Sequence, residues 1–257
     1  MLPQYLGEHR TTVAALSLDD IYLTHADQGQ LAQRYPHNKL LHGRGLPGTH
    51  DMALGTSALE RLRAINSSER EVELPTYDKS RFGGEGDRTD EVVRVSKQVD
   101  VVVFEGWMTG FEPLESSQLE STHREARDDG EAFASRLKLG YTPPFCAEQD
   151  AKVLQELNDL LRPYHDALWR HIDAFVQLAP QSLNFVWQWR LEQEHNMKRQ
   201  NGGKGMSDEQ VKQFIARYMP AYELFMGGID SDNAPWKGRG LRLTVGPTRE
   251  ILDTATF

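Results

Sequence analysis

The amino-acid sequence predicts an α/β protein in which a parallel sheet is flanked by helices. Two short apolar runs carry this prediction, at residues 11–16 (TTVAAL) and 99–104 (VDVVVF). Neither run has an amphipathic period, which is typical of strands buried on both faces of a parallel sheet. A third run covers residues 172–178 (IDAFVQL). Stretches with apolar residues at helical spacing separate the runs, as expected when helices connect parallel strands.

Acidic residues follow the first two runs, where each predicted strand ends. Asp19 and Asp20 come shortly after the first run, and Glu105, followed by a glycine, comes directly after the second. The carboxyl ends of parallel strands face the crevice in which ligands bind, so we expect these side chains to lie close together. Carboxylates placed there can hold Mg²⁺ beside a phosphate. Helix capping or pairing with an arginine would explain the same residues without any chemistry.

The composition predicts a soluble globular protein with an acidic balance. The 257 residues are 39% hydrophobic and 26% charged, with a formal net charge of −9. This charge argues against nucleic acid and anionic membranes as partners, because both favour basic surfaces. The single cysteine, Cys146, excludes an intrachain disulfide and favours a reducing compartment. With neither a membrane-spanning apolar run nor a secretory signal, we expect a cytoplasmic protein, while the oligomeric state stays open.

We expect a single domain over residues 1–257, with two additions to the sheet. Residues 112–150 are rich in Glu, Ser, Asp and Gln and predict an irregular acidic insertion. Residues 182–225 predict helices joined by a loop of glycine and lysine, the second helix opening with a capping box at Ser207. The cations of this region either form a lid that closes over phosphates or complement helix dipoles; they are Arg190, Lys198, Arg199 and Lys204.

Two polar segments combine glycine with positive charge. Residues 26–47 are predicted to be a loop that leads into the glycine-rich GRGLPG (43–48). His50 follows at the start of a helix, where capping does not explain it, and we expect it to face the crevice. Residues 79–88 form a second, basic loop. In an acidic protein such a loop suggests an anionic ligand, or else it is a solvated hairpin tip.

Six segments carry a stronger signal because they occur together and in order. They are SLDDIYLT (17–24), GRGLPGTHD (43–51), LPTYDKS with GDR (74–80 and 86–88), DVVVFEGWMTGF (100–111), WRLEQEH (189–195) and GKGMSDEQVKQFIARYMPAY (203–222). Together they resemble the glycerate 3-kinase family, a group of P-loop small-molecule kinases from plants and fungi. The resemblance implies a P-loop-kinase fold with a helical lid, ATP and Mg²⁺ as cofactors, and a small hydroxylated substrate such as glycerate or a similar hydroxy acid.

The resemblance also implies roles for individual residues. Asp19 matches the aspartate that accepts the proton of the attacking hydroxyl, and Arg190 falls in the lid that stabilises the transferring phosphoryl group. Glu105, together with Asp20, would organise Mg²⁺. Tyr77, Asp78 and Lys79 fall where related kinases hold their substrate. The residues themselves lead us to expect substrate binding from Arg44, His50 and Arg88 as well, and nucleotide binding from Lys198 and Lys204. A carboxylate substrate also needs a cationic clamp, for which four candidates stay open: Arg44, Lys79, Arg81 and Arg88.

One part of the family pattern is missing from the sequence. The family begins with a strand, a loop of the G-x-x-x-x-G-K-[S/T] kind and a helix, and the 257 residues contain no such loop. That loop supplies backbone N–H groups, a lysine and a hydroxyl to the phosphates and Mg²⁺. We therefore expect an N-terminally incomplete copy of an active kinase. The alternative is a catalytically inactive homologue that acts as a binding protein.

Overall fold

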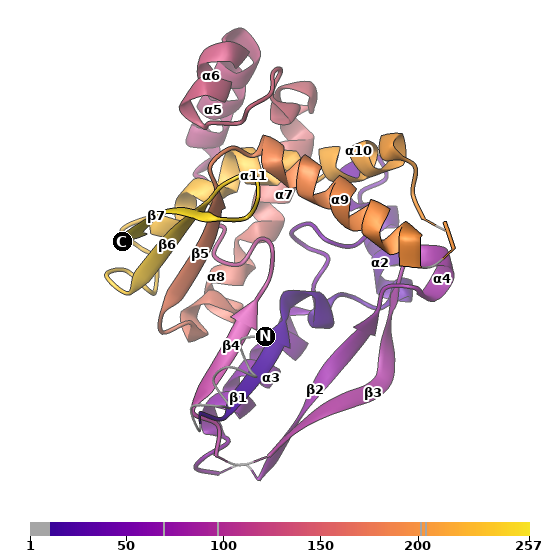
Figure 1. Cartoon of the computed structure of the whole chain (residues 1–257), viewed down its shortest axis with the longest axis vertical. Coiled ribbons are helices and arrows are strands. Elements are labelled where there is room, and N and C mark those ends of the chain that lie inside the picture. Colours follow the sequence, from indigo (N-terminus) through magenta and orange to yellow (C-terminus); the bar gives the residue numbers. More distant parts are fainter. Residues whose placement is uncertain (1–10, 69, 97, 201, 204) are drawn as a thin grey trace. The chain divides into compact units, whose positions relative to one another are not determined.

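The computed structural model describes residues 11–68, 70–96, 98–200, 202–203 and 205–257 (Figure 1). These residues form two compact units, and the single domain expected over residues 1–257 stays a prediction. Unit 1 runs to Gly110 and includes Leu160–Ile172, and unit 2 comprises Phe111–Asp159 and Asp173–Phe257. Each unit is therefore built from segments that lie far apart in the sequence.

Unit 1 contains the two strands that end in acidic residues. β1 (Val13–Ser17) and β4 (Val101–Glu105) pair in parallel, with Ser17 opposite Glu105. Figure 1 shows the two strands side by side. The predicted parallel pairing is confirmed, but burial on both faces is not, since Val101 is 39% exposed. Among the described residues β4 pairs with β1 alone.

A hairpin and several helices complete unit 1. β2 (Glu71–Asp78) and β3 (Asp87–Ser96) form an antiparallel hairpin, and the predicted basic loop is its tip, which includes α4 (Arg81–Gly84) (Figure 1). The stretch expected to be a loop at residues 26–47 begins instead with a helix, α2 (His25–Arg34). Only Leu31 of α2 is buried, so the sequence carries too weak an apolar pattern to predict it. The other elements are η2 (Lys39–Leu41), α3 (Met52–Ala64), α8 (Pro163–Ala167) and η4 (Trp169–His171).

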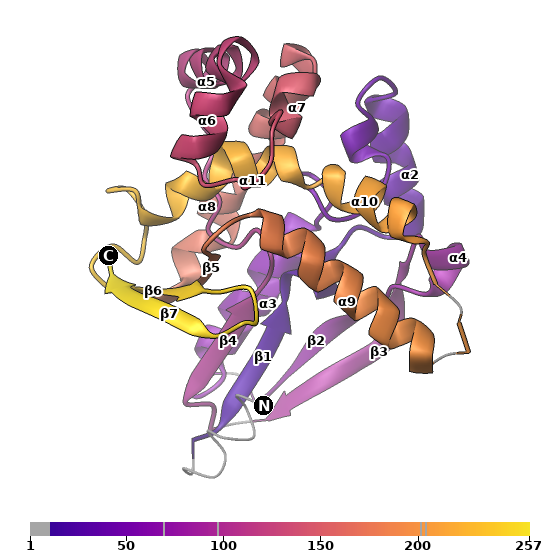
Figure 2. The same ribbon diagram turned by 45° about the horizontal axis from the view of Figure 1, so that its top comes forward.

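Unit 2 contains a second, three-stranded sheet. β5 (Phe175–Pro180) pairs in parallel with β6 (Gly240–Val245), which pairs antiparallel with β7 (Ile251–Thr256) (Figure 2). The third predicted strand is therefore confirmed, although it begins at Phe175. The remaining elements are α5 (Ser116–Asp128), α6 (Gly130–Arg136), η3 (Phe145–Glu148), α7 (Ala151–Leu161), whose end belongs to unit 1, α9 (Asn184–Gln200), α10 (Asp208–Ala216), α11 (Met219–Phe225) and η5 (Met226–Asp230).

The segment expected to be an irregular acidic insertion is mostly helical. Residues 112–150 contain α5, α6 and η3. Leu119, His123 and Ala126 of α5 are buried, at the spacing of one helix face. The expectation of irregular structure was wrong. The few residues that form the buried helix face stand among many charged and polar residues, so the sequence shows no clear helical pattern.

Residues 182–225 contain the helices α9, α10 and α11, as the sequence predicts. Ser207 caps α10, since its Oγ accepts the backbone N–H of Gln210 at 3.2 Å, and the Gln210 side chain accepts the N–H of Ser207 at 2.8 Å. The closing movement of a lid remains a prediction. None of the described helices is both long enough and apolar enough to cross a membrane.

Gly106, the residue after Glu105, allows η1 (Leu18–Ile21) to pack against the end of β4. A methyl group added at Gly106 would lie 2.5 Å from Cβ of Leu18 and 2.9 Å from Oγ1 of Thr109. Leu18 is fully buried, and its Cβ moves only with the backbone of η1. The glycine after Glu105 therefore lets η1 close over the paired strand ends.

We expect Gly106→Ala to lower the free energy of unfolding by about 1–3 kcal/mol, the usual cost of overpacking a filled site. The matched control is Gly29→Ala in α2, where no atom lies within 4 Å of the added methyl group. There alanine should raise stability by about 0.5–1 kcal/mol, because glycine is a poor helix former. Urea unfolding of both variants and the unsubstituted chain makes the comparison. Effects of the same sign would contradict the steric role of Gly106.

Candidate functional site

Three carboxylates gather where β1 and β4 end. Asp19 and Asp20 lie in η1, directly after β1, and Glu105 is the last residue of β4. Burial raises the pKa of Asp20, and the negative charges of Asp19 and Glu105 raise it further. The structure therefore brings together the acidic strand ends that the sequence singles out.

Asp20 also makes a purely structural contact. Its Oδ2 accepts the N–H of Ser17 at 3.1 Å, and Oγ of Ser17 accepts the N–H of Asp19 at 3.2 Å. These bonds form the capping box that starts η1. Capping thus accounts for an aspartate at position 20, but for neither of the other two carboxylates.

Asp19 is held by one partner on each carboxylate oxygen. The Lys79 ammonium group forms an ion pair with Oδ2, and the Tyr22 hydroxyl donates to Oδ1 at 2.6 Å. Burial acts to raise the pKa of Asp19, but these two partners outweigh it, and the pKa is lowered. Asp19 is therefore an ionised and oriented carboxylate at neutral pH.

Aromatic rings pack around Tyr22. His50 stacks on Tyr22 with ring centroids 4.7 Å apart, and Tyr77 meets Tyr22 edge-on at 5.2 Å. The Arg44 guanidinium lies 5.9 Å from the centroid of the Tyr77 ring. Three residues expected to bind substrate, His50, Tyr77 and Arg44, are thus connected to Asp19 through Tyr22.

The arginine candidates for a carboxylate clamp differ in their contacts. Arg88 donates from Nη2 to the carbonyl of Tyr22 at 2.9 Å and to Asp51 at 3.1 Å. The buried Nε of Arg88 has no hydrogen-bond partner among the described residues. Arg44 donates to backbone carbonyls of the hairpin tip, and Arg81 donates to the carbonyl of Arg88 at 2.9 Å. Arg88 is therefore the arginine of this set with an unused buried donor.

Asp78 belongs to the turn of the hairpin tip. Its Oδ1 accepts the N–H of Ser80 at 2.8 Å and the Ser80 hydroxyl at 2.6 Å, and its Oδ2 lies 3.7 Å from Nε of Arg81. The bonds from Ser80 lower the pKa of Asp78. Asp78 therefore stabilises the turn, and none of these contacts links it to Asp19.

Two of the expected phosphate-binding cations lie on α9 of unit 2, Arg190 and Lys198. The Arg190 guanidinium lies 5.3 Å from the centroid of the Phe214 ring, and its Nη1 donates to Gln193 at 2.8 Å. Its Nη2 lies 3.8 Å from the buried carboxylate of Glu194. Arg199 also lies on α9, whereas Lys204 lies outside the described residues.

Two side chains of the cluster escaped the sequence reasoning, Tyr22 and Tyr164. Tyr22 stands in the segment SLDDIYLT, three residues after Asp19, and that spacing on a helical turn was an available signal. Tyr164 stands among apolar residues at helical spacing, a pattern that predicts core packing. Its hydroxyl lies 2.6 Å from Nδ1 of His50. No local pattern signals this contact, because it joins residues far apart in the sequence.

The strand-end carboxylates are suited to Mg²⁺. The described residues contain no group of three or more His, Cys, Asp or Glu side chains that could hold a metal ion by themselves. Mg²⁺ usually binds through one or two carboxylates, completed by water and phosphate oxygens. Asp20 and Glu105 offer oxygen donors, and a cation between them would relieve the repulsion that raises the pKa of Asp20. The donor set therefore fits the metal.

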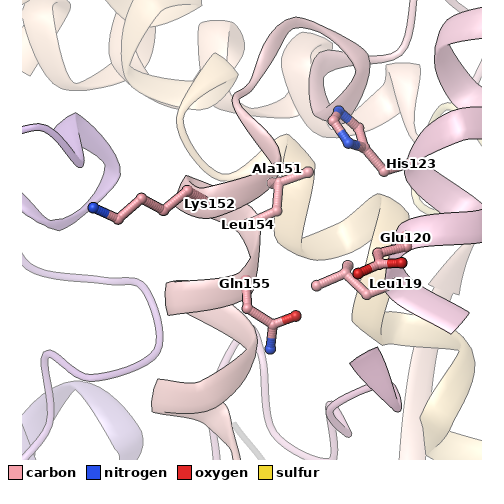
Figure 3. A pocket seen from close by; sticks show the side chains of 7 residues that line it. All are labelled: Leu119, Glu120, His123, Ala151, Lys152, Leu154 and Gln155. Carbon is pink, nitrogen blue, oxygen red and sulfur yellow. The ribbon is translucent and has the colours of Figure 1, made fainter. Parts of the chain in front are cut away.

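A separate pocket lies within unit 2, between α5 and α7 (Figure 3). It has a volume of about 210 Å³ and is lined by Leu119, Glu120, His123, Ala151, Lys152, Leu154 and Gln155. None of these residues belongs to the six segments that resemble the kinase family. The pocket is therefore distinct from the kinase-like cluster.

No protein-family model matches the chain. A solved D-glycerate 3-kinase from Cryptococcus neoformans matches it with a TM-score of 0.93 and 49% identity, over 100% of this chain and 84% of that one. The uncharacterized kinase mug58 of Schizosaccharomyces pombe is 38% identical, over 88% of this chain and 74% of its own length. The probable ATP-dependent kinase TDA10 of Saccharomyces cerevisiae is 34% identical, over 100% of this chain and 80% of its own length.

The chain belongs to the glycerate 3-kinase family. It is therefore a kinase, that is, a phosphotransferase, and the resemblance drawn from the six segments is confirmed. The predicted fold, an α/β P-loop-kinase-like arrangement, is confirmed by the match to a solved member of the family over the whole chain.

Proposed function

We propose that this glycerate 3-kinase family member transfers the γ-phosphoryl group of ATP to a hydroxyl group of glycerate or a similar hydroxy acid. The observation that carries the proposal is the strand-end cluster, in which an oriented Asp19 lies beside Asp20 and Glu105. Phosphoryl transfer needs positioning and charge neutralisation more than covalent chemistry, so a base, a cation site and a substrate clamp are the parts required. The name of the solved relative, D-glycerate 3-kinase, supports glycerate as the acceptor.

Asp19 is the proposed general base. Lys79 and Tyr22 each hold one of its oxygens, which fixes the carboxylate in one orientation toward an incoming hydroxyl. As the substrate oxygen bonds to the γ-phosphorus and the bond to the leaving ADP oxygen breaks, the hydroxyl proton passes to Asp19. A base held in this way contributes typically 10²–10⁴-fold to the rate.

Glu105 and Asp20 are the proposed Mg²⁺ ligands, directly or through water. When bound, Mg²⁺ neutralises charge on the phosphates. The capping bond from Ser17 keeps Asp20 at the end of β1, and Gly106 keeps Glu105 against η1. The Ser17 N–H therefore holds the Asp20 carboxylate itself, whereas for Glu105 it is the backbone that packs against η1.

Arg88 is the proposed anchor for the substrate carboxylate. Its guanidinium is fixed by the Tyr22 carbonyl and Asp51, and it keeps one buried donor unpaired among the described residues. A planar guanidinium matches the geometry of a carboxylate. By contrast, Lys79 is engaged with Asp19. Further substrate contacts are proposed for Arg44, His50, Tyr77, Asp78 and Lys79, of which Asp78 has the least support.

Arg190, Lys198 and Lys204 are the proposed partners of ATP. Arg190 would stabilise the transferring phosphoryl group, and the two lysines would bind the other phosphates. The support for Arg190 and Lys204 is the resemblance of segments 189–195 and 203–222 to the family, whereas Lys198 is included because it is one of the cations clustered in the predicted lid. The contacts of Arg190 with Phe214 and Gln193 hold its guanidinium in one place on α9.

The alternative function is that of a non-catalytic protein which binds a metabolite through the same cluster. One observation favours it, the absence of a P-loop pattern from the 257 residues. Calorimetry on this chain separates the two functions. Binding of D-glycerate without binding of Mg·ATP favours the alternative, whereas binding of both favours the kinase.

Asp19→Asn should lower turnover of ATP with D-glycerate by about 10²–10⁴-fold, because the amide cannot accept the hydroxyl proton. The assay uses the chain joined to a strand, P-loop and helix from another small-molecule kinase, since the 257 residues contain no P-loop pattern. The matched control is Asp128→Asn, at the exposed end of α5, which should keep full activity. Unchanged turnover in Asp19→Asn would contradict the role of the base. Lack of turnover with every small hydroxy acid tested, in the unsubstituted protein, would contradict the kinase.

Arg88→Gln should raise KM for D-glycerate by about 10- to 100-fold with a smaller change in kcat. The reason is that a hydrogen bond to a charged group is worth roughly 1.5–3 kcal/mol. Arg81→Gln removes a more exposed arginine of the same loop, with a side chain 44% exposed against 24% for Arg88, and should raise KM little. The measurement is KM for D-glycerate from steady-state kinetics of both variants. If Arg81→Gln raised KM as much as Arg88→Gln or more, Arg88 would be ruled out as the anchor.

A further inference from the structure

His50 and Tyr164 form a buried pair in unit 1. His50 is 4% exposed and Tyr164 is 1% exposed, and the Tyr164 hydroxyl lies 2.6 Å from Nδ1 of His50. The two rings meet edge-on with centroids 5.6 Å apart. Beyond packing, the hydrogen bonds of this pair determine which imidazole nitrogen carries the proton.

The Tyr164 oxygen accepts a hydrogen bond from a backbone N–H group. Gly48 donates to it at 2.9 Å. An N–H group can only donate, so this partner does not accept the hydroxyl proton. Burial raises the pKa of Tyr164, so the hydroxyl keeps its proton. That proton therefore points to the remaining neighbour, Nδ1 of His50.

Because Nδ1 accepts this bond, the neutral imidazole of His50 carries its proton on Nε2. The opposite tautomer would direct a second N–H donor at the Tyr164 oxygen and leave the hydroxyl proton without an acceptor among the described residues. Burial lowers the pKa of His50 to about 3, against the opposing attraction of Asp19. At neutral pH the ring is therefore an uncharged Nε2–H donor.

The Nε2 atom is shielded from water and has no hydrogen-bond partner among the described residues. Buried donors are almost always paired in folded proteins, because an unpaired one destabilises the fold. The titratable groups around the ring are Asp19, Tyr22 and Tyr164, and Asp19 is close enough for its charge to act on His50. The ring that carries the unpaired donor thus lies within range of the charge of the proposed base.

We propose that Tyr164 is a positioning residue that fixes His50 as an uncharged Nε2–H donor, and that this donor hydrogen-bonds an oxygen atom of the hydroxy-acid substrate beside Asp19. The identity of the substrate rests on the proposed function, whereas the tautomer does not. An uncharged ring matters at this position, because an imidazolium would pair with Asp19 and compete with the substrate hydroxyl for that carboxylate.

The tautomer is tested by ¹⁵N NMR of the whole chain labelled in histidine, because protonated and unprotonated ring nitrogens differ widely in chemical shift. At pH 7 and at pH 5 we expect His50, assigned by the loss of its signals in His50→Gln, to be protonated on Nε2 alone. Tyr164→Phe should produce a mixture of tautomers, while Tyr222→Phe in unit 2 should leave the His50 signals unchanged. A His50 protonated on Nδ1, or on both nitrogens, in the unsubstituted chain would overturn the inference.

The donor role is tested by adding D-glycerate to the same labelled chain, without ATP. We expect the His50 Nε2 signal to shift at saturation and Tyr164→Phe to bind D-glycerate about tenfold more weakly, as for the loss of one hydrogen bond. His50→Gln retains an amide N–H donor and should bind better than His50→Ala. Binding that leaves the Nε2 signal in place would overturn the donor role. If no hydroxy acid binds, the proposed function and the donor role fail together, while the tautomer result stands by itself.

Discussion

The parallel pairing of β1 with β4 is the interaction on which the rest of unit 1 depends. Its register places Ser17 opposite Glu105, so both strands end at the same level and their acidic residues meet. A slip of one residue would turn every side chain of one strand to the other face and separate Glu105 from η1. The absence of a side chain at Gly106 lets η1 close over the strand end. The strand register and this glycine together therefore determine where the acidic residues lie.

The second feature of the site is its arrangement of charge. Lys79 compensates the negative charge of Asp19. Asp20, by contrast, lies beside the negative charges of Asp19 and Glu105, which add to the effect of burial in raising the pKa of Asp20. Positive groups come from the loops around this cluster, with Arg44 stacked over Tyr77 and Arg88 bound to the Tyr22 carbonyl. A protein with a net charge of −9 thereby combines the proposed cation site with positive groups at the proposed substrate site.

Much of this site could be predicted from the sequence, because its strongest signals are local. An apolar run that ends in carboxylates identified β1 and β4, and short segments such as SLDDIYLT and DVVVFEGWMTGF identified the family. Contacts between distant residues could not be predicted: the bond from Tyr164 to His50 joins α8 to the start of α3, and periodicity assigns Tyr164 to the core. Helices with few apolar residues were also missed, since α2 buries only Leu31 and the buried face of α5 lies within a strongly polar stretch. Asp78 was expected to bind substrate because of its motif, whereas its contacts are those of a turn.

The most direct test of this account is a double-mutant cycle between Asp20 and Glu105, measured by urea unfolding at pH 7.5. If the two carboxylates are neighbours, Glu105→Gln should stabilise the chain more with aspartate at position 20 than with asparagine, by roughly 0.5–1 kcal/mol. The same cycle with Glu73, an exposed residue of β2, should be additive within about 0.5 kcal/mol. Additivity of Asp20 and Glu105 would contradict the claim that the two strand ends form one site.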